Sequence, residues 1–351
     1  MMKEYNVAIL GATGAVGTRL MQKLAESNIP VKSLKLLASK RSAGKKLKYR
    51  DDVLTVEEAT PDSFDGVDLV LASAGGAVSK KLLPEAVKRG AVAVDNTSAF
   101  RMDPDVPLVI PEVNPDALEN HHGIIANPNC STIQMVVALE PIRKQFGLKQ
   151  IIVSTYQAAS GAGQSGLDEL RDEAQEHLDG KKMDAHIFPV KGEKEHYPLA
   201  FNLLPQIDVF EKDGYTHEEW KMIHETKKIM LNDMNSGAIK VTATCVRVPV
   251  EICHGESVYF TVDDAKDASR EKIQSILNDA PGVTLKDDPK KQLYPQPIDA
   301  AGKEDTYVGR VRPDQENDNA YNMWVVADNL LKGAALNTVE IGEELVKRDL
   351  I

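Results

Sequence analysis

Residues 5–17 indicate the fold class of this chain and read Tyr5-Asn6-Val7-Ala8-Ile9-Leu10-Gly11-Ala12-Thr13-Gly14-Ala15-Val16-Gly17. Its apolar run predicts a strand, and the glycines at 11, 14 and 17 lead from that strand into a helix. The first glycine permits a tight turn, the second lets the backbone approach a pyrophosphate, and the third lets the helix pack against the strand. A glycine-rich loop in this position predicts a dinucleotide site, with a purely structural turn as the alternative. Its members would be Gly11, Thr13, Gly14, Ala15, Val16 and Gly17.

Outward from this loop, apolar runs alternate with segments of helical period. In the N-terminal third we expect strands at 7–10, 34–39, 67–72, 91–95 and 108–111, and helices at 16–27 and 78–89. Such alternation predicts an α/β fold whose first domain is Rossmann-like, with a mostly parallel, doubly wound sheet. The remainder predicts an α+β domain with an antiparallel or mixed sheet. Its strands are expected at 150–157, 239–250 and 257–262, and its helices at 132–146, 166–178, 216–232 and 327–348.

Composition and charge argue against nucleic-acid-binding, membrane-spanning and disulfide-rich proteins. The net charge of -11 disfavours nucleic acid and anionic membranes as partners, so anionic ligands must be held by locally placed Arg and Lys. No run approaches the roughly 20 apolar residues that span a bilayer, and the N-terminus leaves no room for a signal peptide. Three cysteines are too few for a disulfide framework. We therefore expect a soluble, cytoplasmic protein.

The turn after the second strand bears on the choice of dinucleotide. NAD-specific domains usually carry an acid there, which binds the ribose 2′-hydroxyl. This chain has Ser39-Lys40-Arg41-Ser42-Ala43-Gly44-Lys45-Lys46 instead, with no acid. Hydroxyls and cations suit a 2′-phosphate, so the turn predicts NADP, with a solvated basic turn as the alternative.

A candidate nucleophile lies in Asn127-Pro128-Asn129-Cys130-Ser131-Thr132, at the start of a predicted helix. A helix N-terminus stabilises a thiolate, so Cys130 is the cysteine expected to be reactive, with a buried structural cysteine as the alternative. Cys245, inside an apolar strand, is expected in the core, and Cys253 has no assignment. Aldehyde oxidation by a thiolate needs a general base, and His254, in a turn after the 239–250 strand, is the histidine we favour.

Six motifs together resemble the aspartate-semialdehyde dehydrogenase family, whose order they keep over nearly the whole chain. They are the glycine loop at 11–17, Ser98-Ala99-Phe100-Arg101, the Cys130 motif, Glu218-Glu219-Trp220-Lys221, Cys245-Val246-Arg247-Val248-Pro249-Val250 with His254, and Asp328-Asn329-Leu330-Leu331-Lys332-Gly333-Ala334-Ala335. The resemblance implies an NADP-binding domain, residues 1–129 and 327–351, and an inserted catalytic and dimerisation domain, residues 130–326. It also implies a homodimer or a homotetramer.

The resemblance assigns roles residue by residue. Cys130 would be the nucleophile, His254 the acid/base and Gln157 the group that orients the intermediates. Arg247 and Glu218 would hold the substrate carboxylate and amino group, and the phosphate site would be Arg101, Asn129 and Lys221. The residues expected near the cofactor are Ser160, Gly161, Gly163 and Asn329, with Ser39, Arg41 and Ser42 at its 2′-phosphate.

The activity that follows is the reversible, NADPH-dependent reduction of L-4-aspartyl phosphate to L-aspartate 4-semialdehyde, with release of phosphate, in lysine, diaminopimelate, threonine and methionine biosynthesis. Covalent capture by Cys130 requires no metal. Two alternatives stay open: an enzyme like N-acetyl-glutamyl-phosphate reductase, and a catalytically silent nucleotide-binding subunit. The joint presence of Cys130, Gln157, Arg247 and His254 argues against the second.

Overall fold

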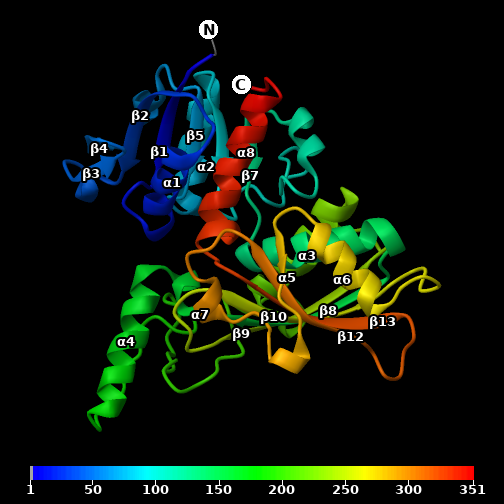
Figure 1. Ribbon diagram of the computed structural model, residues 1–351. Helices are drawn as coiled ribbons and strands as arrows, with labels where there is room; N and C mark the ends of the chain where they lie inside the picture. The colour runs from blue at the N-terminus through cyan, green and yellow to red at the C-terminus, as the bar shows by residue number, and fades with distance from the viewer. Residues whose placement is uncertain (1–2) are drawn as a thin grey trace. The chain divides into compact units, whose positions relative to one another are not determined.

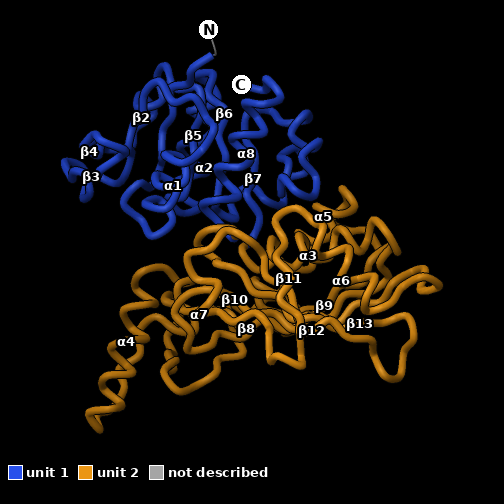
Figure 2. Tube along the Cα trace, in the orientation of Figure 1, with its two compact units in different colours: residues 1–129, 333–351 blue, residues 130–332 orange. Residues whose placement is uncertain are grey.

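The computed structural model describes residues 3–351, and the chain forms two compact units (Figure 2). Unit 1 holds the described residues up to Asn129 together with Gly333–Ile351, and unit 2 holds Cys130–Lys332. Within the described range, every helix is too short or too polar to cross a bilayer.

Unit 1 is built on a seven-stranded sheet in the order β3-β4-β2-β1-β5-β6-β7 (Figure 1). Neighbouring strands are parallel except β3 and β4, which pair antiparallel at one edge. The strands are β1 (Tyr5–Leu10), β2 (Val31–Ala38), β3 (Lys46–Tyr49), β4 (Asp52–Glu58), β5 (Leu69–Ala72), β6 (Val92–Asp95) and β7 (Ile124–Ala126). The helices are α1 (Ala15–Glu26), α2 (Gly76–Lys88), α8 (Leu336–Lys347) and the short η1 (Lys40–Ser42), η2 (Pro61–Phe64) and η3 (Pro115–Asn120).

Helices cover both faces of this sheet. Leu20 of α1 and Leu345 of α8 share one apolar core with Ile9. Leu83 of α2 shares a second core with Leu10 on the opposite face, because consecutive strand residues point to opposite sides of a sheet. The predicted α/β class with a Rossmann-like first domain is therefore confirmed.

Two sequence predictions in unit 1 differ from the structure. The expected strand at 108–111 is a single bridge between Leu108 and Ala126, since β7 takes the edge position. The antiparallel pair β3 and β4 was not predicted, because these two strands near the edge of the sheet are mostly exposed and charged and lack the apolar run of the central strands.

Unit 2 has a six-stranded mixed sheet in the order β11-β12-β13-β10-β8-β9 (Figure 1). The pairs β11/β12 and β8/β9 are parallel and the others antiparallel. The strands are β8 (Gln150–Gln157), β9 (Lys240–Arg247), β10 (His254–Thr261), β11 (Val283–Leu285), β12 (Thr306–Pro313) and β13 (Ala320–Ala327). The helices are α3 (Cys130–Phe146), α4 (Gln164–Leu178), α5 (His217–Leu231), α6 (Arg270–Asp279), α7 (Pro297–Ala300), the short η4 (Ala159–Ala162), η5 (Lys212–Gly214) and η6 (Pro289–Lys291), and the π-helical turn Leu331–Ala335, which crosses into unit 1.

Sequence signals place the strands β8, β9 and β10 and the helices α3, α4 and α5, but they miss β11, β12, β13 and α6. The predicted capping box opens α5: Thr216 accepts from the backbone N–H of Glu219, and the Glu219 carboxylate accepts from the N–H of Thr216. Strand β8 has the predicted bounds. The expected turn at His254 is wrong, because His254 is the first residue of β10, and the turn ends at Cys253 with φ +77°.

The C-terminal helix begins later than predicted. Residues 320–327 form β13, and the Asp328 carboxylate accepts from the N–H groups of Leu330 and Leu331, so the helical turns start only after Asp328. Asn329 bonds to Ser160 and to Cys253, which keeps this segment in unit 2. The division between the units consequently falls at Gly333 and not at the expected residue 327.

Candidate functional site

Cys130 occupies the N-terminus of α3 in unit 2 and is partly exposed. Its Sγ lies 3.1 Å from Nε2 of His254, which is within hydrogen-bonding distance. The helix dipole and this ring nitrogen both favour the thiolate over the thiol. The predicted nucleophile and the predicted histidine are thus neighbours in space, although 124 residues separate them.

His254 is fully buried, and the protein fixes its orientation. The backbone N–H of Ala158 donates to its Nδ1 at 3.0 Å. Burial, assisted by Arg247, lowers the pKa of His254 to about 3, while Glu218 acts in the opposite direction. The ring is therefore neutral, and because Nδ1 accepts a hydrogen bond, its proton is on Nε2, the atom that faces Cys130.

The three polar residues expected around the substrate are close together in the same unit. Gln157 Nε2 donates to Glu218 Oε1 at 3.1 Å, and Arg247 Nη1 donates to the carbonyl of Ala158 at 2.8 Å. Glu218 also acts on the pKa of Arg247 and raises it, against the larger lowering by burial. A buried guanidinium and a buried carboxylate beside a reactive cysteine suit an amino-acid substrate, which carries charges of both signs.

Gly161 is needed for this arrangement. A Cβ at Gly161 would lie 2.7 Å from Arg247 Nη1 and 3.5 Å from Cε1 of His254. Only a glycine leaves Arg247 room in its observed position. Gly161, predicted to approach a cofactor, thus also leaves room for the side chain of Arg247 beside His254.

The other residues of unit 2 predicted near the cofactor form a small polar group. Asn329 hydrogen-bonds through its side chain to Ser160 Oγ, at 3.0 to 3.1 Å, and accepts from the N–H of Cys253 at 2.9 Å. Gly163, with φ +79°, is the residue before α4. These contacts attach the Ser160 loop to the segment that precedes His254.

The phosphate residues predicted from the resemblance belong to both units. Lys221 of unit 2 pairs with Asp208 at 2.8 Å and with Glu218 at 3.2 Å. Arg101 of unit 1 donates from Nη2 to the carbonyl of Asn96 at 2.9 Å. Asn129 is the last residue of unit 1 before Cys130. A phosphate site shared by these residues stays a prediction, because neither unit by itself brings Arg101 and Lys221 together.

The glycine loop of unit 1 has the predicted steric features at two positions. A Cβ at Gly11, where φ is +91°, would lie 2.4 Å from the carbonyl oxygen of Ser73, and one at Gly17 would lie 2.1 Å from that of Gly11. At Gly14 the nearest atom would be 3.4 Å away, so the protein itself does not require a glycine there. Gly14 precedes α1, which begins with Ala15 and Val16, and leaves the helix N-terminus open to a ligand.

This loop borders a cavity of about 760 Å³ at the carboxyl ends of the unit 1 strands. Of the residues predicted to bind the cofactor, Gly11, Thr13, Gly14 and Ser39 line this cavity, whereas Ala15, Val16, Gly17, Arg41 and Ser42 do not. The Ser42 hydroxyl lies 3.3 Å from that of Thr13, and Arg41 is exposed on η1. The sequence interpretation missed other lining residues of suitable chemistry, which are Lys40, Thr60 and Lys81.

Lys40 could have been singled out, since it belongs to the basic turn that predicted NADP. Lys81 lies on α2, outside every motif, so no sequence pattern marked it as a cofactor contact. Three features fit a dinucleotide phosphate at this edge of the sheet. They are the open N-terminus of α1, a glycine at position 14 that no contact within the protein requires, and the cations of Lys40 and Lys81.

The remaining cysteines are unsuited to catalysis. Cys245 and Cys253 are fully buried, and desolvation raises the pKa of both thiols. The predicted core position of Cys245 is confirmed, and Cys253, unassigned from sequence, is a core residue as well. Among residues 3–351, no cluster of His, Cys, Asp and Glu side chains could hold a metal ion.

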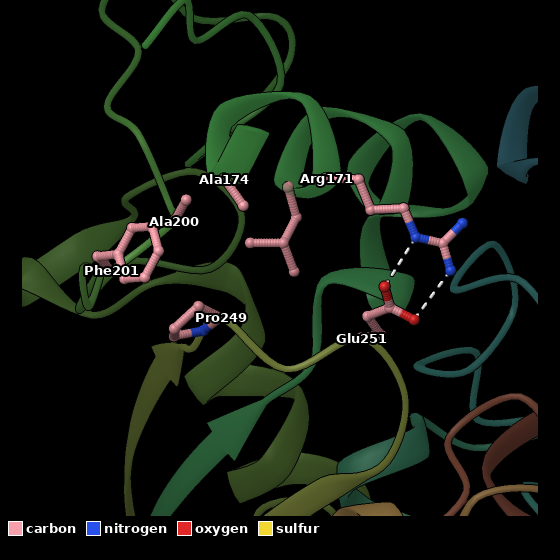
Figure 3. A pocket seen from close by; sticks show the side chains of 7 residues that line it. Arg171, Ala174, Ala200, Phe201, Pro249 and Glu251 are labelled. Atoms are coloured by element: carbon pink, nitrogen blue, oxygen red, sulfur yellow. Dashed lines mark hydrogen bonds and ion pairs between the residues drawn. The ribbon is translucent and has the colours of Figure 1, made fainter. Parts of the chain in front are cut away.

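A second cavity, about 440 Å³, lies in unit 2 beside α4 and contains none of the predicted site residues (Figure 3). Arg171 and Glu251 form a bidentate ion pair at its rim, with distances of 2.7 and 2.9 Å, and the exposed ring of Phe201 lies on the opposite side (Figure 3). This cavity is therefore not part of the site formed by Cys130 and His254.

Comparison with known proteins adds two domain matches and full-length relatives. Residues 6–121 match the NAD binding domain of semialdehyde dehydrogenases, and residues 139–332 match their dimerisation domain. The chain is 56% identical over 351 residues to the aspartate-semialdehyde dehydrogenase of Bacillus subtilis, with all of both chains covered.

Two solved structures are similar over nearly their whole length. Aspartate semialdehyde dehydrogenase II from Vibrio cholerae, complexed with ASA, has a TM-score of 0.92 and 44% identity, over 98% of this chain and 99% of that one. The aspartate semialdehyde dehydrogenase of Candida albicans with NADP has a TM-score of 0.77 and 26% identity, over 99% and 100% of the two chains.

Proposed function

The chain belongs to the aspartate-semialdehyde dehydrogenase family, and we propose that it converts L-4-aspartyl phosphate and L-aspartate 4-semialdehyde into one another through a thioester on Cys130, with NADP as its cofactor. The observation that carries the proposal is the 3.1 Å contact between Cys130 Sγ and His254 Nε2, at a helix N-terminus and beside buried Arg247 and Glu218. The product aldehyde supplies amino-acid biosynthesis.

Cys130 acts as the nucleophile. In the reductive direction its thiolate attacks the acyl carbon of aspartyl phosphate, phosphate leaves, and a thioester forms. Bound NADPH supplies the hydride that reduces this thioester. The resulting tetrahedral oxyanion collapses to the aldehyde and restores the thiolate, so the acyl carbon is reduced by two electrons and the sulfur ends unchanged.

His254 stabilises negative charge at two stages. Its Nε2–H donates to the Cys130 thiolate in the resting site and to the substrate oxygen when that oxygen becomes an anion. Gln157 provides an amide group near this centre and orients the acyl group. In place of the predicted acid/base role, His254 keeps its proton on Nε2 and donates a hydrogen bond to the reacting atoms.

Arg247 and Glu218 bind the two charged groups of the amino acid. The guanidinium pairs with the α-carboxylate and the Glu218 carboxylate with the α-ammonium. We assign phosphate to Lys221, Arg101 and Asn129. An acetylated amino group would remove the ammonium that Glu218 binds, which favours aspartate over an N-acetylated glutamate substrate.

The cofactor proposal rests on the 760 Å³ cavity of unit 1, which we take as the site of the adenosine phosphates. Gly11 and Gly14 would hold the pyrophosphate, and Ser39 and Lys40 the 2′-phosphate, with Arg41 and Ser42 beside it. The residues of unit 2 that would contact the nicotinamide are Ser160, Gly161, Gly163 and Asn329. Unit 1 is accordingly the nucleotide-binding domain, and unit 2 the catalytic and dimerisation domain.

We also propose that the protein is a homodimer formed through unit 2. One face of its sheet is covered by α3, α5 and α6, whereas the large apolar side chains of Ile152 and Tyr156 on β8 are exposed, 40% and 39%. Phe201 and Leu203 are also exposed, 64% and 58%. Exposed apolar surface of this kind marks an interface. Light scattering should give twice the 38.5 kDa of one chain, and a mass of one chain would contradict the proposal.

The activity is tested by mixing the protein with aspartate semialdehyde, NADP and phosphate and recording absorbance of NADPH. Reduction of NADP should require phosphate in every turnover after the first. A higher rate with N-acetylglutamate semialdehyde, or none with either aldehyde, would contradict the proposed substrate.

A further inference from the structure

Glu256 is a buried carboxyl group with no role in the mechanism above. It lies on β10 two residues after His254, so both side chains point to the same face of the sheet. Its exposed fraction is 0%, and neither carboxyl oxygen has a hydrogen-bond partner of good geometry among residues 3–351. An ionised carboxylate in such a place would be strongly disfavoured.

Two features favour the neutral form of this carboxyl group. Burial raises the pKa of Glu256 well above its ordinary value, and the negative charge of Glu218 on α5 raises it further. The Gln134 side chain lowers it, with a smaller effect than burial, and no Lys or Arg is among the groups that act on it. In its protonated form, Glu256 offers one donor and one acceptor.

Gln134 has the complementary groups. It lies one helical turn after Cys130 on α3 and is buried. Its Nε2 donates to the backbone carbonyl of His254 at 3.3 Å, whereas its Oε1 has no partner among the described residues. A primary amide has two N–H groups, so Nε2 can serve both His254 and the Glu256 carbonyl, while Oε1 accepts the proton of the acid.

We propose that Glu256 is a positioning residue for the reaction proposed above: as a neutral acid it pairs with the amide of Gln134, which holds the start of β10 to the helix that bears Cys130. The pair joins the two elements whose ends place Sγ and Nε2 3.1 Å apart. Gln134 fixes the backbone of His254, and Ala158 fixes its ring. Glu256 touches neither substrate nor cofactor and acts through these contacts.

The test compares Glu256→Gln with Glu256→Leu. Glutamine is a neutral analogue of the protonated acid and can form the same pair, so its kcat should stay within about threefold of wild type. Leucine removes the pair, and kcat should fall roughly 10- to 100-fold with little change in KM, the usual effect of losing a supporting contact. The second readout is the rate of Cys130 alkylation against pH, which needs no substrate and is therefore independent of the proposed function. Its midpoint should be unchanged in the glutamine variant and raised in the leucine variant.

Val258→Ala is the matched control, because Val258 is buried on the same strand, two residues farther from His254. It should lower Tm without changing kcat or the alkylation midpoint. Two results would overturn the proposal. A loss in Glu256→Gln as large as in Glu256→Leu would mean that the residue acts through a charge or a transferred proton. Wild-type kcat and alkylation in Glu256→Leu would mean that it positions nothing. If the leucine variant does not fold, the glutamine variant alone still decides whether the acid is neutral.

Discussion

Gly161→Ala tests whether the position of Arg247 sets substrate affinity. The added Cβ would lie 2.7 Å from Arg247 Nη1, whereas ordinary contacts begin at 3.4 Å, so Nη1 must move by about 0.7 Å. That movement weakens or breaks its 2.8 Å hydrogen bond to the carbonyl of Ala158 and turns the guanidinium away from the substrate carboxylate. Nη1 is the end of a flexible side chain, so the fold can adjust at low cost.

The magnitude follows from the interaction that is lost. A charge-assisted hydrogen bond contributes about 1.5 to 3 kcal/mol, which corresponds to a fall of roughly 10- to 150-fold in kcat/KM for aspartate semialdehyde. The KM for NADP should change much less, and Tm should stay within about 2 °C of wild type.

Steady-state kinetics with each substrate varied in turn, together with a thermal melt, measures these effects. Gly192→Ala is the matched control, because a Cβ there meets nothing within 4 Å and its φ is not positive. Equal kinetics for both variants, or a loss in Gly161→Ala confined to NADP, would refute the reasoning about Arg247.

Three further predictions concern the nucleophile, the cofactor and the histidine. Brief treatment with iodoacetamide near neutral pH, followed by mass spectrometry, should label Cys130 first, since Cys245 and Cys253 are buried with raised pKa values; earlier labelling of either would contradict the assignment. Lys40→Ala should raise the KM for NADP by roughly 10-fold or more and leave that for NAD unchanged, with a smaller effect from the exposed Arg41→Ala, and an equal loss for both dinucleotides would count against a 2′-phosphate contact. Because the pKa of His254 is lowered to about 3, the ring stays neutral from pH 5 to 9, so log kcat should show no ionisation near 6.5. A wild-type inflection near 6.5 that disappears in His254→Ala would show that the ring titrates during turnover.

Local patterns were sufficient for most of the first domain and for part of the second. The glycine loop with the strand before it predicted the first domain, and the alternating Gln150–Gln157 predicted a strand with the observed bounds. At the C-terminus the apolar stripe of Leu330, Leu331 and Ala334 predicted a helix from residue 327, whereas α8 begins at Leu336. The strand β13 was not predicted, because its pairing with β10 and β12 is a long-range interaction that no local period reveals.

Part of the candidate site was also predictable from the sequence, and part was not. Cys130 was predictable from its place before a helix, and Arg247 and Glu218 from the family motifs. The contact between Ala158 and the ring of His254 was not, since it depends on a backbone group. Glu256 has no motif and, in sequence, is an ordinary charged residue in a strand. Only its burial beside Gln134 distinguishes it.

Trapping the acyl group shows directly whether Cys130 forms the thioester. The protein is mixed with aspartate semialdehyde and NADP in the absence of phosphate, and both the NADPH formed and the mass of the Cys130 peptide are measured. We expect a burst of one NADPH per chain and a Cys130 peptide that carries one aspartyl group. Addition of phosphate should release the aspartyl group and start continuous formation of NADPH. No burst, or an aspartyl group on any other residue, would contradict a thioester on Cys130.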